Sequence, residues 1–239
     1  MKAAAFERIQ AKKSSLPEQA AEQISQLIIS QHLTYAEKLP SEFELAEQLN
    51  VGRGTIREGV KLLVARNVLE IRRGKGTYIA SNPGEISDPL GLQFYTNQFQ
   101  LALDLAEIRH QMEPWIAQMA AEQATVEDLK SLRESCSVVE EDVLAKQNHT
   151  QSDVMFHVCI AKCTRNLVLP KLIPIITYAS KLFSTLKEIQ LITEMLAEHR
   201  EILDAICNRD GEQAAKAMSR HIEHSKAIVV KVGTDSPSK

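Results

Sequence analysis

Apolar residues recur at three- and four-residue spacing through most of this chain, which predicts a largely helical protein. In the first third, Pro17 opens one amphipathic pattern, and two shorter patterns cover about residues 42–49 and 53–66. The tight turn Asn50-Val51-Gly52 separates the last two patterns, and Ser41 is a suitable N-cap for the first of them. Two short helices joined by so brief a turn predict a helix-turn-helix.

After this motif the period of the pattern changes to two, which indicates strands. Apolar and polar residues alternate over residues 69–72 and again over residues 77–79, and Gly74-Lys75-Gly76 forms the turn between them. Three helices followed by a β-hairpin predict a winged helix-turn-helix domain over residues 1–80.

The rest of the chain returns to helical spacing. Residues 81–98 contain breaks at Ser81-Asn82-Pro83-Gly84 and form a linker in this interpretation. The pattern predicts a C-terminal antiparallel all-α bundle of six to seven helices over residues 99–232. It predicts a disordered tail over residues 233–239. Pro170 and Pro174 are expected to bend or break the fourth of these helices. The expected helices cover about residues 100–124, 126–146, 149–163, 167–189, 191–208 and 211–231.

The composition is typical of a globular protein with two modest domains. The 239 residues are 44% hydrophobic and 25% charged. No apolar run approaches the roughly 18–20 residues that cross a bilayer, and the first residues lack the apolar core of a signal peptide. The four scattered cysteines contain no CxxC pair, so we expect reduced thiols in a cytoplasmic protein without a membrane partner.

The net charge of −3 is unevenly distributed. Residues 1–83 carry twelve Lys and Arg against nine Asp and Glu, a charge of +3, and the remainder carries −6. A basic first third favours an anionic partner for that part. The N-terminal end of the second helix of such a motif lies nearest the base edges of DNA, and here it carries Arg53, Thr55 and Arg57. Lys75 at the hairpin turn is placed to reach an adjacent groove or phosphate. Any single one of these side chains is also compatible with a solvated helix face.

Four residues in the C-terminal region have the spacing of a metal site. Asp153 and His157 are four residues apart, on one face of a helix. His199 and His221 lie near the middle of the last two expected helices. One carboxylate and three imidazoles suit a borderline divalent ion such as zinc, nickel or manganese. The spacing alone also fits a solvated helix, and other histidines nearby leave the choice open, namely His110, His149 and His224.

Residues 17–80 resemble the winged helix of the GntR family of bacterial repressors. The matching segments are LPSEFELAEQLNVGRGTIREGVKLL and RRGKGTYIA. The resemblance implies contacts with double-stranded operator DNA from Arg53, Thr55 and Arg57, and from Gly74 and Lys75 on the wing. The chain departs from the usual pattern at Tyr35-Ala36, at Gly52 in place of Ser, and at Phe43, where members often carry an Arg that contacts DNA.

Residues 100–225 resemble the FCD ligand-binding domain of the FadR-like branch of that family. The matching segments are AEIRHQMEPWIAQMAAEQAT, DVMFHVCIAKCTRN and EHREILDAICNRDGEQAAKAMSRHI. The resemblance implies that a divalent metal, with zinc as first choice, is coordinated by Asp153, His157, His199 and His221.

The same resemblance implies a pocket for a small carboxylic acid effector. Arg109 matches the position that faces this pocket, and Asn166 matches a position that lines it. Metal and guanidinium would each bind one carboxylate oxygen. The alternative for Arg109 is a salt bridge to Glu113, one helical turn away. The segment EPWIAQMAAEQAT is closest to members that respond to sugar acids.

The interpretation is therefore a transcriptional regulator without catalytic activity. It is expected to be a homodimeric repressor, because the recognition helices need two half-sites, and to release its operator when the acid binds. Two alternatives remain. In a metal sensor the ion itself is the effector, and in a metal-dependent hydrolase the ion activates water, although no general base or nucleophile motif is recognisable.

Overall fold

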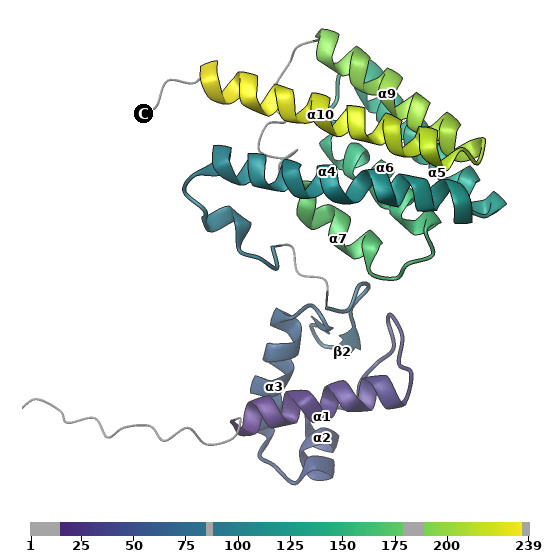
Figure 1. Cartoon of the computed structure of the whole chain (residues 1–239). Coiled ribbons are helices and arrows are strands. Elements are labelled where there is room, and N and C mark those ends of the chain that lie inside the picture. Colours follow the sequence, from purple (N-terminus) through teal and green to yellow (C-terminus); the bar gives the residue numbers. More distant parts are fainter. Residues whose placement is uncertain (1–14, 85–87, 179–188, 236–239) are drawn as a thin grey trace, which may run out of the picture. The chain divides into compact units, whose positions relative to one another are not determined.

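The computed structural model describes residues 15–84, 88–178 and 189–235, with residues 189–192 and 232–235 described by their backbone alone. They form two compact units that divide between residues 87 and 88. The elements of the first unit, labelled in Figure 1, are α1 (Leu16–Ser30), α2 (Glu42–Leu49), α3 (Arg53–Ala65), β1 (Leu69–Arg72) and β2 (Gly76–Ile79). Those of the second unit are the 3-10 helix η1 (Leu92–Phe94) and the helices α4 (Gln98–Gln123), α5 (Val126–Leu144), α6 (Thr150–Cys163), α7 (Leu169–Ile176), α9 (Ile189–Cys207) and α10 (Gly211–Asp235).

The first unit is a winged helix-turn-helix. Helix α3 packs against both α1 and α2, and the strands β1 and β2 pair in antiparallel fashion. Its core joins the fully buried side chains of Ile24, Ile56, Leu63 and Ile79. Apolar residues at helical spacing thus meet the inward positions of the hairpin, as the change of period predicted.

The segment before α2 also belongs to the wing, which the sequence pattern did not indicate. The Leu39 N–H donates to the carbonyl of Thr77 at 2.9 Å, and the Ile79 N–H donates to the carbonyl of Glu37 at 3.0 Å. Gly76 has φ +123°, and a Cβ there would lie 2.7 Å from Cε of Lys38. The Lys38 side chain could move aside, but the positive φ, which other residues rarely adopt, favours glycine at this point of the wing.

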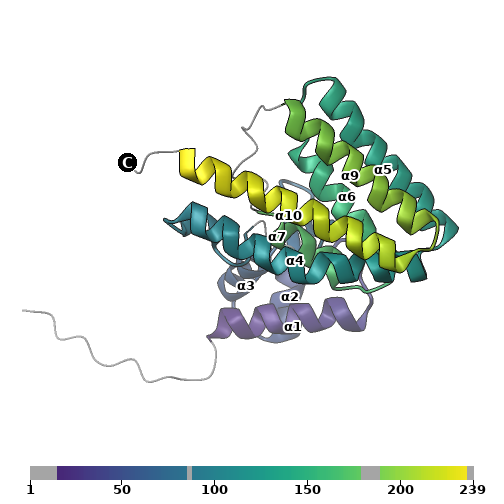
Figure 2. The ribbon, with the colours of Figure 1, turned by 45° about the horizontal axis from the view of Figure 1, so that its top comes forward.

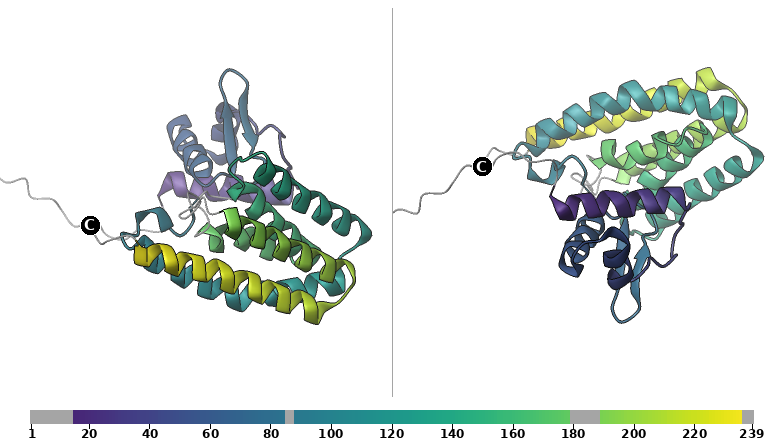
Figure 3. Two further views of the ribbon diagram at one scale, coloured as in Figure 1. Left: turned by 90° about the horizontal axis from the view of Figure 1, so that it is seen from above. Right: turned by 90° about the horizontal axis from the view of Figure 1, so that it is seen from below.

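The second unit is an all-helical bundle built around two long antiparallel helices. Helices α4 and α10 lie side by side along most of their length (Figures 1 and 2). Alanines such as Ala102, Ala117 and Ala217 are fully buried, which allows the two backbones to approach closely. Helices α6 and α9 pack against this pair, and α5 covers α6 and α9 (Figure 3).

The ends of three predicted segments differ in the structure. The fourth helix of the bundle, predicted over 167–189, is the shorter α7, which has Pro170 in its first turn and ends at Ile176. Residues 179–188 lie outside the described residues. The predicted linker 81–98 is split, because Leu92 is buried in a small cluster with α4 and α10. Helix α10 extends three residues into the predicted tail 233–239, whose last four residues are not described.

Helix α5 begins with a reciprocal cap that makes a simple test of the bundle. The hydroxyl of Thr125 accepts from the N–H of Asp128 at 3.2 Å, and the carboxylate of Asp128 accepts from the N–H of Thr125 at 2.9 Å. We predict that Thr125→Ala lowers the free energy of unfolding of the bundle by about 1 kcal/mol, measured by urea titration. Ser131→Ala on the exposed face of α5 is the control and should change it by less than about 0.5 kcal/mol. Equal losses in both variants would contradict the capping role.

Candidate metal centre and DNA-binding surface

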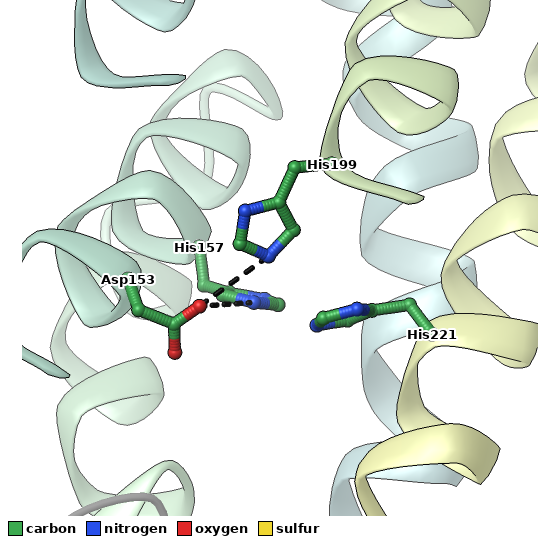
Figure 4. A group of neighbouring side chains, drawn as sticks. All are labelled: Asp153, His157, His199 and His221. Atoms are coloured by element: carbon green, nitrogen blue, oxygen red, sulfur yellow. Dashed lines mark ion pairs between the residues drawn. The ribbon is translucent and has the colours of Figure 1, made fainter. Parts of the chain in front are cut away.

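Four side chains from three different helices converge inside the second unit. Asp153 and His157 point from successive turns of α6, His199 comes from α9 and His221 from α10 (Figure 4). One potential ligand atom from each lies within 4.8 Å of the other three. All four residues are buried, with exposed fractions between 0% and 8%. The structure therefore brings together the whole set of residues that the sequence suggested for a metal.

The polar atoms of this group have the environment that a metal ion would complete. Among the described residues, Oδ1 of Asp153, Nε2 of His157 and Nε2 of His199 are inaccessible to water and have no hydrogen-bond partner. Oδ1 of Asp153 lies 3.3 Å from Nε2 of His199 and 4.0 Å from Nε2 of His157. Each buried polar atom without a partner costs about 1–3 kcal/mol. Because zinc–ligand bonds measure about 2.0–2.2 Å, the group would need only small shifts to close around an ion.

Two carboxylates orient two of the imidazoles. Nδ1 of His157 bonds to Glu113 of α4, and Nδ1 of His221 bonds to Oε2 of Glu198 at 3.1 Å. An ionised carboxylate only accepts, so each Nδ1 carries the proton and each Nε2 lone pair is directed to the centre. Nε2 is therefore the ligand atom of both rings, in the arrangement that commonly supports a metal-bound histidine.

Burial and neighbouring charges favour the metal-binding protonation states of Asp153, His199 and His221. Burial lowers the pKa of His221 to about 4 and also lowers the pKa of His199. Burial alone would raise the pKa of Asp153, but the close approach of His199 and the other nearby imidazoles lowers it below its usual range. At neutral pH both of these imidazoles are neutral and the carboxylate is ionised, as metal ligation requires.

The charges around the group also suit a divalent cation. Three carboxylates, those of Asp153, Glu113 and Glu198, belong to the group or bond directly to it. The guanidinium of Arg109 is the positive charge beside them. Burial would raise the pKa of Glu113, but Arg109 and His157 lower it to about 2. The three carboxylates and the one guanidinium sum to −2, which one divalent ion balances. Three nitrogens and one oxygen suit zinc, nickel or manganese.

Of the two residues predicted to bind the effector, Arg109 is buried and Asn166 is exposed. Arg109 is buried on the inner face of α4, where its Nε donates to Oε1 of Glu113 at 2.5 Å. The predicted alternative, a salt bridge, is therefore present, and it connects Arg109 through Glu113 to His157. Asn166 is exposed, and its Oδ1 accepts from the N–H groups of Val168 and Leu169 at the start of α7. Its described hydrogen bonds are local to this helix start.

The predicted DNA-binding residues of the recognition helix lie at the start of α3. Arg53 is the first residue of the helix and is exposed, Thr55 is half-buried, and Arg57 is exposed one turn further on. Nη2 of Arg57 donates to Oε2 of Glu42 on α2 at 3.0 Å. Gly52 occupies the N-cap without a side-chain cap, so the first N–H groups of α3 are not capped by a hydroxyl.

The predicted wing residues lie at the turn between β1 and β2. Gly74 has φ +70°, which glycine adopts without strain. Lys75 is exposed, and its carbonyl accepts from the hydroxyl of Tyr78 at 3.2 Å. The guanidinium carbon of Arg72 lies 4.3 Å from the centre of the Tyr78 ring. The wing therefore holds its cationic turn in a defined shape.

Sequence reasoning missed three residues that support these sites. Glu113 was considered only as a partner for Arg109, although it also orients His157. Glu198 and Glu42 were not considered. One signal was available, since Arg109 and Glu113 continue the buried stripe of α4 at positions where a core pattern calls for apolar residues. Buried charges in such a stripe indicate a site.

A winged helix-turn-helix followed by an all-helical bundle is the architecture of a DNA-binding transcriptional regulator. This protein belongs to the GntR family of bacterial regulatory proteins, in its FadR-like branch. Residues 16–79 match the model of bacterial regulatory proteins of the gntR family, and residues 104–224 match the FCD domain. Family membership makes it a regulator rather than an enzyme. None of the described helices is long and apolar enough to cross a membrane.

Individual relatives agree with this assignment. The Uxu operon transcriptional regulator of Escherichia coli (strain K12) is 31% identical over 215 residues, covering 85% of this chain and 82% of the relative. The Exu regulon transcriptional regulator of the same strain is 27% identical over 212 residues, covering 83% and 78%. The solved structure of Streptococcus agalactiae GntR is 38% identical, with a TM-score of 0.79 over 89% of this chain and 99% of that one.

The buried group predicts a stability that depends on metal. Zinc, nickel or manganese at a hundred times its dissociation constant should stabilise the fold by about 2.7 kcal/mol, which thermal denaturation detects as a rise in Tm. His199→Ala removes a central ligand and should abolish this rise. His149→Ala is the matched control, because this histidine precedes α6 outside the group, and it should keep the rise. A metal-induced rise that survives in His199→Ala would show that the ion binds elsewhere.

Proposed function

We propose that this protein is a homodimeric repressor whose affinity for its operator is controlled by a small carboxylate metabolite bound beside a divalent metal ion. The buried group of Asp153, His157, His199 and His221 is the observation that carries the proposal. DNA binding follows from the family, whereas the metal, the acid and the direction of control are the proposed part. The two named relatives regulate an operon and a regulon, which supports a similar role here.

The electrostatics of the second unit favour an acid as the signal. A metal ion held by four protein ligands accepts a further oxygen when its coordination expands. The guanidinium of Arg109 is buried near this group, since Asp153 is among the charges that act on it. A guanidinium has five N–H donors, so bonding to Glu113 is compatible with binding a carboxylate as well. Residues 113–125 resemble those of family members that respond to sugar acids. This resemblance favours a hydroxylated acid as the effector.

The exposed cations of the first unit support contacts with DNA. Arg53 and Arg57 are exposed on the first turns of α3, which this motif inserts into the major groove. Lys75 is exposed at the wing turn and suits a phosphate or an adjacent groove. Two copies of the chain would present two such sets of cations to a two-fold operator, which is the basis for proposing a homodimer.

Substitutions in the first unit should separate base contacts from phosphate contacts. Arg53→Ala should weaken operator binding by about 1–3 kcal/mol and relax sequence preference, since Arg pairs with guanine. Lys75→Ala should weaken binding to all sequences and reduce the salt slope by about 1. Fluorescence anisotropy with a labelled fragment of the upstream region measures both. Lys130→Ala, exposed on α5, is the control for a lost positive charge. Losses of DNA affinity no larger than that of the control would show that Arg53 and Lys75 do not contact DNA.

The effector is identified by repeating the anisotropy titration with a panel of small carboxylic acids, with and without metal. The expected result is tight binding that resists unrelated duplex and is lost with one acid, provided that the protein is loaded with metal. A response to metal in the absence of any acid would establish the metal sensor instead. Release by an acid in thoroughly chelated protein would show that the metal has no part in the response.

Arg109 provides a test of how the acid is held. Arg109→Lys keeps the positive charge beside Glu113 but loses the planar fork that binds a carboxylate through two bonds. We predict about a tenfold or greater increase in the concentration of acid needed for release, with little change in operator affinity without acid. Circular dichroism and Tm are the folding controls, because the side chain is buried. An unchanged acid response in a folded variant would exclude a clamp by Arg109.

A further inference from the structure

We call Asp153, His157, His199 and His221 the metal group. A series of polar contacts leads from this group towards the surface between α9 and α10. Nδ1 of His221 bonds to Oε2 of Glu198 at 3.1 Å, and Nδ1 of His224 bonds to Oε1 of the same carboxylate at 3.0 Å. Nε2 of His224 in turn lies 3.2 Å from Oε2 of Glu194. The exposed fraction of the side chains rises along this series, from 3% at His221 to 14% at Glu198, 24% at His224 and 46% at Glu194.

We propose that Glu198 is a positioning residue for His221, that it determines how tightly His221 binds the ion, and that His224 holds Glu198 in place. The inference rests on the proposed metal site. It adds two residues that do not touch the ion and that belong to no ligand motif of the sequence.

The first step of the argument is the tautomer of His221. A neutral imidazole has one N–H and one lone pair, and only the lone pair binds a metal. Glu198 accepts the proton of Nδ1, so the lone pair resides on Nε2, on the side of Asp153 and His157 (Figure 4). Without the carboxylate, the ring loses the bond that selects this tautomer and orientation.

The second step is the way in which Glu198 is itself held. Each of its two oxygens is bonded to a different histidine, and both histidines come from α10 at a spacing of three residues. The carboxylate on α9 thus fits between two side chains on one face of α10. Oε2 of Glu194, from the preceding turn of α9, lies 3.2 Å from Nε2 of His224 and limits the space in which that ring can rotate. Both oxygens of Glu198 are therefore held by histidines, and this keeps Oε2 bonded to Nδ1 of His221.

A purely structural explanation is that Glu198 merely joins α9 to α10. The chain contains a matched pair for separating the two explanations, because Glu201 also joins these helices through an ion pair with Arg220. Both Glu201 and Arg220 are exposed, and their ion pair does not include a histidine. A substitution there removes a connection between the same two helices while the tautomer of His221 stays under the control of Glu198.

The test measures the affinity of the full chain for zinc by competition with a chromogenic chelator. Glu198→Ala should weaken zinc binding about 10- to 100-fold, as loss of such a carboxylate does in other metal sites. Glu198→Gln should recover part of the loss, since its amide oxygen still accepts from Nδ1, and His224→Ala should cause a smaller loss. Glu201→Ala should leave the affinity within about twofold. Equal losses in Glu198→Ala and Glu201→Ala would overturn the proposal in favour of the structural explanation.

A second measurement reads the imidazole directly. Nitrogen-15 NMR of the zinc-loaded protein should show His221 coordinated through Nε2 with its proton on Nδ1, and the Nδ1 proton should exchange faster with water in Glu198→Ala than in Glu201→Ala. Equal exchange in the two variants would contradict the positioning role. If the wild-type chain binds no zinc, nickel or manganese, the metal site itself is wrong, which is distinct from binding that is insensitive to Glu198.

Discussion

The enclosure of one carboxylate and three imidazoles in the centre of a helical bundle is the constraint on which the rest of the second unit depends. Polar atoms without partners are costly inside a protein, so the helices around them must supply compensating bonds. Glu113 of α4 and Glu198 of α9 do this for His157 and His221. The ring of Phe156 packs against His199, with ring centres 4.6 Å apart. A divalent ion would satisfy Oδ1 of Asp153, Nε2 of His157 and one ring nitrogen of His199.

This arrangement makes the centre a junction of helices rather than an isolated site. The four residues come from α6, α9 and α10, and α4 joins them through the bond from Glu113 to His157, with Arg109 bonded to Glu113. Under the proposed function, an acid that binds metal and guanidinium acts on four helices at once. Such a ligand favours whichever packing of these helices it binds best, which is the physical basis of control by population shift.

The first unit has a separate core, and one of its predicted DNA-binding residues also bonds to a carboxylate. Arg57 on the recognition helix forms an exposed ion pair with Glu42, whose side chain lies at the start of α2. Exposed ion pairs contribute little to stability, at most about 1 kcal/mol. The pair therefore holds the guanidinium only weakly, and a phosphate or a base can compete for it.

Most of the fold could be predicted from the sequence, because periodicity, caps and turns are local properties. Ser41 with Glu44, the turn at Asn50–Gly52 and the glycines of the wing each indicated a local structure that is confirmed. The four ligands could be proposed because Asp153 and His157 are one turn apart and all four match family motifs. Sequence alone left open whether they met, since helix packing decides which faces are adjacent.

Tertiary structure alone decided the roles that depend on contacts between helices. The bond from Glu113 to His157 spans 44 positions and the bond from Glu198 to His221 spans 23, so no local pattern reports them. It also decided that Asn166 bonds the start of α7, and that Leu92 packs within the second unit rather than lying in a free linker. Local chemistry determined which residues could bind DNA or metal, and packing determined which neighbours orient them.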